Sequence, residues 1–230
     1  MKKYLSPEIP TSAERRQCLR TIVAAAWMSS AALGFSAAAV AAPAGGKILV
    51  VGDSISAEYG IARGSGWVAL LEQKLQHSKS PYQVVNASIS GDTSAGGRAR
   101  FASLLQQHQP AIVVIELGAN DALRGLSLTN TQANLAAMID SSQQAGAQVL
   151  LLGMQVPPNY GAKYTADFAK VFTSLADQKK TGLVPFLLKG VADVPGSEKN
   201  FQADRIHPLA SAHPTLLANV WPALQKLMQK

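Results

Sequence analysis

The sequence contains few cysteines and few charged residues. Cys18 is the one cysteine among 230 residues, and Asp, Glu, Lys and Arg together make up 15%. One cysteine cannot form an internal disulfide or a multi-cysteine metal site. The sequence also has no H-E-x-x-H pattern, no G-x-G-x-x-G pattern and no Walker pattern. We therefore expect no metal and no organic cofactor.

The positive charge of the chain is concentrated near its start. The formal net charge is +7. Residues 1–41 hold five Lys/Arg and two Asp/Glu, so residues 42–230 keep 16 basic and 12 acidic residues and a net charge of +4. The remaining basic residues are scattered, with one Lys-Lys pair at positions 179 and 180. This pattern does not predict nucleic-acid binding.

The first 41 residues have the order of an export signal. Basic residues up to Arg20 precede an alanine-rich apolar run from Thr21 to Ala42, which ends in small residues before Pro43. This order predicts a signal peptide over residues 1–41, cleaved after Ala41, with a periplasmic or secreted mature protein. An uncleaved membrane anchor is the alternative, but serines and glycine dilute the run. The segment ERRQCLR, residues 14–20, leaves Sec and twin-arginine export both open.

Residues 42–230 form one domain of ordinary size. Short apolar runs alternate with amphipathic stretches along it. The predicted strands are Lys47–Gly52, Tyr82–Asn86, Ala111–Leu117, Gln148–Gly153 and Leu183–Phe186. Nearly continuous apolar strands are typical of parallel sheets covered by helices on both faces. The pattern therefore predicts an α/β domain with a three-layer α/β/α arrangement and a five-stranded parallel sheet.

Polar clusters follow several of these strands. They are GDS at residues 52–54, NASISGDT at 86–93, GAND at 118–121 and DRIHP at 204–208. The carboxyl ends of parallel strands meet at one edge of a sheet, where ligands bind. The four clusters are therefore expected to converge.

A serine, a histidine and an aspartate in these clusters fit nucleophilic catalysis. A serine hydroxyl needs a base to accept its proton, and His207 can act on Ser54. Asp204 is three residues before His207, close enough to hold the imidazole in the required tautomer. The backbone N–H groups of Ser54 and Gly91 and the side-chain amide of Asn120 could hold the oxyanion.

These clusters resemble the sequence blocks of the SGNH, or GDSL, hydrolase family over nearly all of residues 42–230. The segments NASISGDTSAGG, IVVIELGANDALRG, PPNYG and DRIHP are most similar to small bacterial periplasmic thioesterases, lysophospholipases and arylesterases. The resemblance implies a flavodoxin-like SGNH hydrolase fold. It also implies a Ser54, His207 and Asp204 triad, oxyanion donors at Ser54, Gly91 and Asn120, and ester and thioester hydrolysis without metal or cofactor.

Two positions depart from the family pattern. Ile55 replaces the leucine of GDSL, a change expected to be silent. Glu58 replaces a glycine that close relatives usually have. A carboxylate there could alter the mouth of the pocket or disfavour anionic substrates, but we favour a solvated side chain on the turn.

Other polar residues compete for the same roles. Ser56 lies close to Ser54 but lacks its placement at the strand end. His77 and His108 fall at helix ends, and His213 is expected at the surface because it has no nearby carboxylate in sequence. Asp53 and Asp121 are expected to brace the loops that carry Ser54 and Asn120.

The sequence predicts a serine esterase that acts on small acyl ester or thioester substrates, including lysophospholipids. The acyl pocket is expected to involve the loops Leu123–Leu128, Pro157–Tyr160 and Leu187–Phe201. No nucleic-acid partner, no stable membrane anchor after cleavage and a monomer are expected. The alternatives are an O-deacetylase of cell-envelope carbohydrates and a non-catalytic binding module with the same fold.

Overall fold

The structure is a computed structural model that describes residues 45–229. The predicted signal peptide, residues 1–41, lies outside the described residues. Within residues 45–229, none of the helices combines the length and the apolar character needed to span a bilayer.

A five-stranded parallel sheet forms the centre of the domain. Its strands are β1 (Gly46–Gly52), β2 (Tyr82–Asn86), β3 (Ile112–Glu116), β4 (Gln148–Leu152) and β5 (Gly182–Val184). They are ordered β2-β1-β3-β4-β5, and every adjacent pair is parallel. This is the flavodoxin-like doubly wound order. The predicted fold class is confirmed.

The apolar character of the strands explains why they are buried. Ile48–Val51 and Ile112–Ile115 are fully buried, as are Leu150–Leu152. The observed strand bounds agree with the predicted ones to within two residues, and β2 agrees at both ends. β5 ends before Pro185, which has no N–H to donate to a neighbouring strand.

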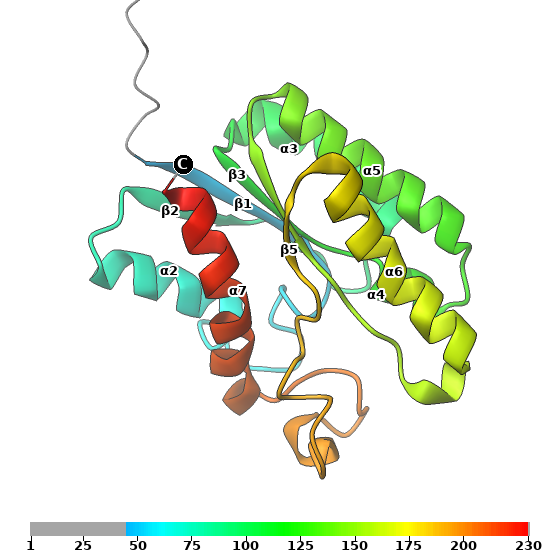
Figure 1. Ribbon diagram of the computed structural model, residues 1–230. Helices are drawn as coiled ribbons and strands as arrows, with labels where there is room; N and C mark the ends of the chain where they lie inside the picture. Colours follow the sequence, from blue (N-terminus) through cyan, green and yellow to red (C-terminus); the bar gives the residue numbers. More distant parts are fainter. Residues whose placement is uncertain (1–44, 230) are drawn as a thin grey trace, which may run out of the picture. The chain divides into compact units, whose positions relative to one another are not determined.

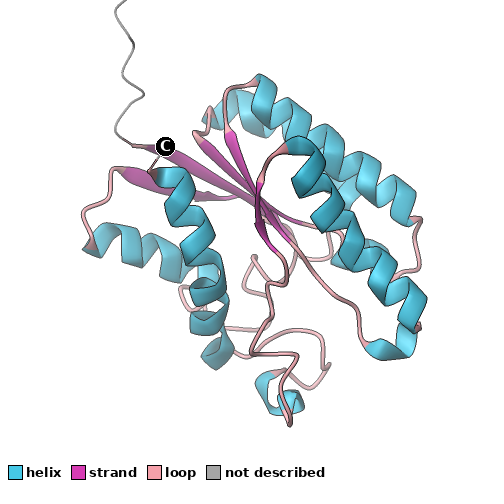
Figure 2. Cartoon of the chain, in the orientation of Figure 1, coloured by secondary structure: helices cyan, strands magenta, loops and turns pink. Residues whose placement is uncertain are grey.

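Helices cover both faces of the sheet. The long helices are α2 (Trp67–His77), α3 (Ser94–His108), α5 (Leu128–Gln144), α6 (Ala162–Lys179) and α7 (His213–Met228). Figure 1 shows α2 and α7 on one face and α3, α5 and α6 on the other, and Figure 2 shows the strands between these layers. Short elements are α4 (Ala119–Leu123) and the 3₁₀ turns Pro158–Tyr160, Ser197–Asn200 and Ala210–Ala212.

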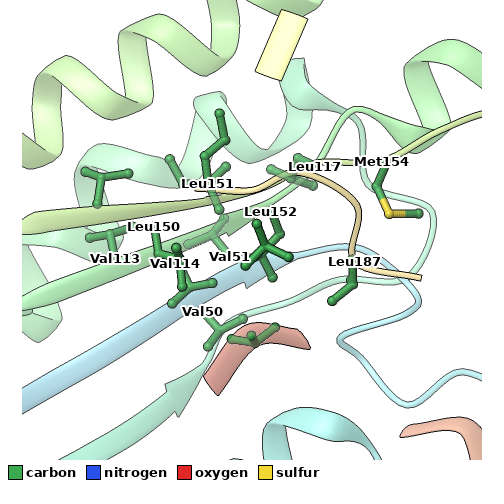
Figure 3. Packing of buried hydrophobic residues seen from close by; sticks show 14 of the residues in the cluster. Val50, Val51, Val113, Val114, Leu117, Leu150, Leu151, Leu152, Met154 and Leu187 are labelled. Carbon is green, nitrogen blue, oxygen red and sulfur yellow. The ribbon is translucent and has the colours of Figure 1, made fainter. Parts of the chain in front are cut away.

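The core lies between the sheet and these helices. Strand residues such as Val50, Val114 and Leu150 lie in register on one face of the sheet, and Leu187 from the loop after β5 joins the same core (Figure 3). Phe168 and Phe172 of α6 are fully buried and meet edge to face, with ring centroids 5.2 Å apart. A rigid sheet therefore supports the loops that begin at the carboxyl ends of its strands.

Candidate active site

Ser54 lies two residues after the interior strand β1, at the start of a tight turn. Gly52 ends the strand where a Cβ atom would come within 2.7 Å of Glu116 Oε2, so only glycine fits without movement. The turn is closed by the N–H of Tyr59, which donates to the carbonyl of Ser54. This turn presents the Ser54 hydroxyl beyond the sheet edge, with the residue 9% exposed.

Ser54, His207 and Asp204 form a continuous hydrogen-bonded chain. His207 Nε2 lies 2.8 Å from Ser54 Oγ, and His207 Nδ1 lies 2.7 Å from Asp204 Oδ2. The structure therefore brings together three predicted residues from opposite ends of the domain. A base next to the hydroxyl and a carboxylate next to the base is the arrangement that activates a serine.

Hydrogen bonds keep the Asp204 carboxyl ionised. Its Oδ1 accepts from the backbone N–H groups of Ile206 at 2.9 Å and His207 at 3.0 Å. Partial burial pushes the pKa of Asp204 upward. The backbone and side-chain hydrogen bonds from His207 outweigh that effect and bring the pKa to about 2. An ionised Asp204 favours the tautomer of His207 that carries its proton on Nδ1.

The loop that carries His207 is also tied to the turn after β1. Gln202 Nε2 donates to the carbonyls of Tyr59 and Pro208, and Gln202 N donates to the carbonyl of His207. The ring of Tyr59 packs on the His207 imidazole with centroids 4.4 Å apart. These contacts restrict the position of the imidazole relative to Ser54.

Two backbone donors near the Ser54 turn are free. Ile89 N donates to the Gly52 carbonyl, which draws the loop after β2 toward the turn after β1. Gly91 then adopts φ 79°, a left-handed conformation that favours glycine. Across residues 45–229, the N–H groups of Ser54 and Gly91 have no hydrogen-bond acceptor. Free donors of this kind can bind a developing oxyanion.

Asn120 lies beside the same turn but already has partners. Its Nδ2 atom donates to Asp53 Oδ2 at 3.1 Å and to the carbonyl of Asp92 at 3.0 Å. Asn120 follows Gly118, which precedes α4 with φ 112°. The two bonds hold the amide next to Ser54 and link the loops after β1, β2 and β3.

A buried pair of carboxyl groups lies behind Ser54. Burial raises the pKa of Asp53 to about 6, against the lowering effect of the Ile55 N–H that it accepts. Burial also raises the pKa of Glu116 well above its usual range, and the charge of Asp53 raises it further. Glu116 Oε2 accepts from the backbone of Asp53 at 3.2 Å and from Ser56 Oγ at 2.7 Å. Burial and the neighbouring charge of Asp53 therefore both favour the protonated form of Glu116.

Ser56 and His213 have structural roles. Ser56 is 1% exposed, donates to Glu116, and accepts from Trp67 Nε1 at 3.1 Å. The prediction of a surface position for His213 is wrong, because its side chain is 2% exposed and its Nδ1 accepts from the Trp67 backbone N–H at 3.0 Å. His213 thereby supplies an acceptor for an N–H in the first turn of α2. The N–H groups of a first turn have no acceptor within their own helix.

Glu58 is neither a free surface residue nor part of the pocket wall. Its Oε1 accepts from the backbone N–H groups of Gly64 at 2.9 Å and Gly66 at 2.7 Å. Gly66 is the N-cap of α2, so the carboxylate lies at the positive end of the helix dipole. Both sequence-based interpretations of Glu58 are replaced by this capping role.

Asp121 braces the loop around Asn120, as expected. Its carboxylate accepts from the backbone N–H of Ser94 at 2.8 Å, from the Ser94 hydroxyl, and from Thr131 Oγ1 at 3.1 Å. These bonds join α4 to the first turns of α3 and α5. Asp121 makes no contact with the Ser54–His207–Asp204 chain of hydrogen bonds.

An apolar cavity of about 570 Å³ opens beside Ser54. Its walls include the three predicted loops, through Leu123, Pro157 and residues between Leu188 and Phe201. Residues directly after β4 and β5 also contribute, and these were not predicted: Met154, Gln155, Val156 and Phe186. The volume is in the range of pockets that bind small molecules.

Two neighbours of the site were missed from the sequence. Glu116 is fully buried although acidic side chains are usually exposed, and the signal was an acid at the end of a run of apolar residues. Tyr59 gave no signal, because its contact with His207 joins segments 148 positions apart in sequence. Among residues 45–229, no group of three or more His, Cys, Asp or Glu side chains forms a metal-binding cluster.

The fold and the site together define a serine hydrolase with a flavodoxin-like α/β fold and with the hydroxyl at the carboxyl edge of the sheet. Residues 50–213 match the model of the GDSL-like Lipase/Acylhydrolase family. The chain belongs to this family. The recognition made from the four sequence blocks is confirmed.

Relatives with assigned names cover most of the chain. The sequence is 55% identical to Esterase TesA of Pseudomonas aeruginosa over 79% of this chain and 89% of that protein. It is 40% identical to Thioesterase 1/protease 1/lysophospholipase L1 of Escherichia coli K12 over 81% of this chain and 87% of that protein. A crystal structure of TesA has a TM-score of 0.75, is 55% identical, and covers 79% of this chain and 99% of its own.

Proposed function

We propose that this enzyme hydrolyses acyl esters and thioesters, including aryl esters, acyl thioesters and lysophospholipids, with Ser54 as the nucleophile. The observation that carries the proposal is the hydrogen-bonded chain from Asp204 through His207 to Ser54 at the mouth of an apolar cavity. The names of the relatives, which include an esterase, a thioesterase and an arylesterase, support the same class of reaction.

In the first half of the reaction, Ser54 Oγ attacks the acyl carbonyl carbon while His207 Nε2 accepts the hydroxyl proton. The N–H groups of Ser54 and Gly91 then donate to the oxyanion. Asn120 adds a third donor by turning one amide hydrogen from Asp53 or Asp92 toward the oxyanion, since catalytic hydrogen bonds often form only with substrate present. His207 gives its proton to the leaving oxygen or sulfur, and the acyl group stays on Ser54.

In the second half, water attacks the acyl-enzyme. His207 accepts a proton from this water, and the same three donors hold the second oxyanion. Collapse of that intermediate returns the proton to Ser54 and releases the carboxylic acid. Asp204 stays ionised throughout and stabilises the charged imidazole.

The cavity supports acyl chains longer than acetyl. Its wall contains Ile55, Leu123 and Met154 next to the site, and Leu188 and Phe201 farther along the loops after β5. Burying each methylene of an acyl chain against such a wall stabilises the complex by about 0.8 kcal/mol. An enzyme dedicated to acetyl groups gains nothing from this wall.

The test is a panel of p-nitrophenyl esters from acetate to palmitate, with Ser54→Ala as the inactive partner and Ser90→Ala as a control on the neighbouring loop. We expect kcat/KM to rise from acetate toward medium chains and to fall by at least about 10³-fold in Ser54→Ala. Equal activity of Ser54→Ala and the wild type would refute the proposal. Activity on acetate alone would instead support the carbohydrate deacetylase.

We also propose that residues 1–41 are removed during export, which leaves a monomeric periplasmic or secreted enzyme. β1 begins at Gly46, so cleavage after Ala41 leaves every described element in the mature chain. The intact mass of protein isolated from the periplasm tests this directly. A mass that retains residues 1–41 would contradict it.

A further inference from the structure

The exposed large apolar side chains of the described domain share one location. Seven such residues have exposed fractions between 37% and 52%, and all seven lie on loops or short turns that follow the carboxyl ends of the strands. They come from the segments after each of the five strands: Tyr59, Ile89, Leu126, Tyr160, Val194, Ile206 and Leu209. The long helices and the opposite edge of the sheet carry none within residues 45–229.

Single exposed apolar residues are ordinary, but their concentration around a binding site is informative. We call the surface formed by these seven residues the apolar rim. Ile206 belongs to both the rim and the cavity wall, and Val194 lies next to Asp193 of that wall. The Tyr160 hydroxyl donates to the carbonyl of Leu123, another wall residue, at 3.4 Å. The rim therefore lies at the same edge of the sheet as the cavity and contacts its wall.

Unpaired positive charges accompany the apolar rim. Five exposed basic residues lie on the same loops and form no salt bridge within residues 45–229: Arg63, Arg124, Lys189, Lys199 and Arg205. Two exposed acids, Asp193 and Glu198, oppose them, while Asp204 is engaged with His207. The loops at this edge thus carry exposed apolar side chains together with an excess of positive charge.

We propose that this face docks reversibly on an anionic lipid bilayer, so that an acyl chain passes from the lipid directly into the cavity. Apolar tips from separate loops can enter the headgroup boundary, and tyrosines are favoured at that depth. Each basic side chain near an anionic surface adds to the attraction. A second copy of the chain fits less well, because two such faces would bring their positive charges together.

The proposal extends the proposed function, but its test does not depend on turnover. Ser54→Ala protein, isolated after export and with its mass verified, is mixed with vesicles of phosphatidylcholine containing 25% phosphatidylglycerol. Binding is measured by flotation, and vesicles of phosphatidylcholine alone give the uncharged comparison. We expect clear binding to the anionic vesicles and at least about tenfold weaker binding to the neutral ones.

Three double variants in the Ser54→Ala background locate the contact. Leu126→Ser with Val194→Ser removes two apolar tips that do not line the cavity, and should weaken partitioning at least about tenfold. Arg63→Gln with Lys199→Gln should weaken it about fivefold per charge. Lys170→Gln with Lys226→Gln removes the same charge from exposed positions on α6 and α7, and should change partitioning less than about twofold.

Several results would overturn the proposal. The first is absence of binding to anionic vesicles. The second is a loss of binding in the α6 and α7 control as large as in the other two variants. The third is unchanged binding in both the apolar and the basic double variants of the loops. A dimer in light scattering that Leu126→Ser with Val194→Ser converts to a monomer would assign the face to a second copy instead. With Ser54 restored, that variant should hydrolyse soluble p-nitrophenyl butyrate normally. Vesicle binding without any esterase activity would refute the proposed function and leave the docking face standing.

Discussion

Replacing Asp204 by asparagine tests how the imidazole of His207 is held. Asp204 uses its two oxygens differently, because Oδ1 accepts two backbone N–H groups, from Ile206 and His207, whereas Oδ2 faces His207 Nδ1. Asparagine has only one oxygen. We expect that oxygen to remain with the two backbone donors, since turning it away would leave both N–H groups facing an amide that cannot accept.

The amide nitrogen of the new asparagine would then face His207 Nδ1. Because that nitrogen can only donate, Nδ1 must accept, and the imidazole proton moves to Nε2. His207 Nε2 lies 2.8 Å from Ser54 Oγ, so a proton on it prevents removal of the serine proton. We expect kcat to fall by about 10³- to 10⁴-fold, a loss of about 4–5.5 kcal/mol in transition-state stabilisation. KM should change little, because Asp204 does not line the cavity.

The assay is the steady-state hydrolysis of p-nitrophenyl butyrate, with thermal unfolding measured on each variant. Asp193→Asn is a matched control, since Asp193 belongs to the same long loop and one of its oxygens accepts a backbone N–H from Gly190. The control should keep kcat within about threefold. If folded Asp204→Asn enzyme keeps more than a tenth of the wild-type kcat, the carboxylate does not set the tautomer of His207 and the reasoning fails.

Three further predictions concern Asn120, the proposed third oxyanion donor, and two residues whose roles the structure revised. Asn120→Ala should lower kcat by about 10²- to 10³-fold with little change in KM, and a loss confined to KM would contradict its role as a donor. Burial lowers the pKa of His213 below 6.5, so the unfolded chain binds this proton first as the pH falls. The free energy of unfolding should therefore decrease below about pH 6.5, and His213→Asn should flatten that slope in urea titrations whereas His108→Asn should not. Glu58→Ala should lower the free energy of unfolding by about 1 kcal/mol at unchanged kcat/KM, because Gly64 and Gly66 lose their acceptor. Unchanged stability in the same urea titrations would refute the cap.

The sheet could be predicted from the sequence because the apolar composition of its strands indicates that they are buried. The runs Ile48–Val51 and Ile112–Ile115 are apolar at every position, which favours strands covered on both faces. A parallel sheet places all strand ends at one edge, so the polar clusters that follow the strands had to meet. That rule is sufficient to predict that Ser54 and His207 lie close together.

Side-chain partners that depend on packing could not be predicted in the same way. His213 is 146 positions from Trp67, and nothing near either residue in the sequence indicates that one accepts a hydrogen bond from the other. Glu58 is a cap only because the chain folds back to present Gly64 and Gly66 to it. In both cases the three-dimensional path of the backbone decides the role, whereas the sequence shows only the residue type.

Glu116 is intermediate between the strands, which the sequence predicts, and the side-chain partners, which it does not. An acid at the end of the run IVVIE is visible in the sequence, and a buried position for it follows from the strand pattern. Its partners, Ser56 and the backbone of Asp53, become visible only once β1 and β3 are paired. A charged residue inside a predicted buried strand is therefore a useful signal of a polar network next to a site.

The most direct test of the central claim is covalent labelling of the nucleophile. The exported enzyme is treated with one equivalent of an alkyl fluorophosphonate, and its intact mass and labelled peptide are measured by mass spectrometry. We predict one phosphonyl group for each chain, located on Ser54, with loss of activity in proportion to labelling and no label on Ser54→Ala. A label on Ser56 or on another serine, or full activity in fully labelled enzyme, would contradict the assignment of Ser54 as the nucleophile.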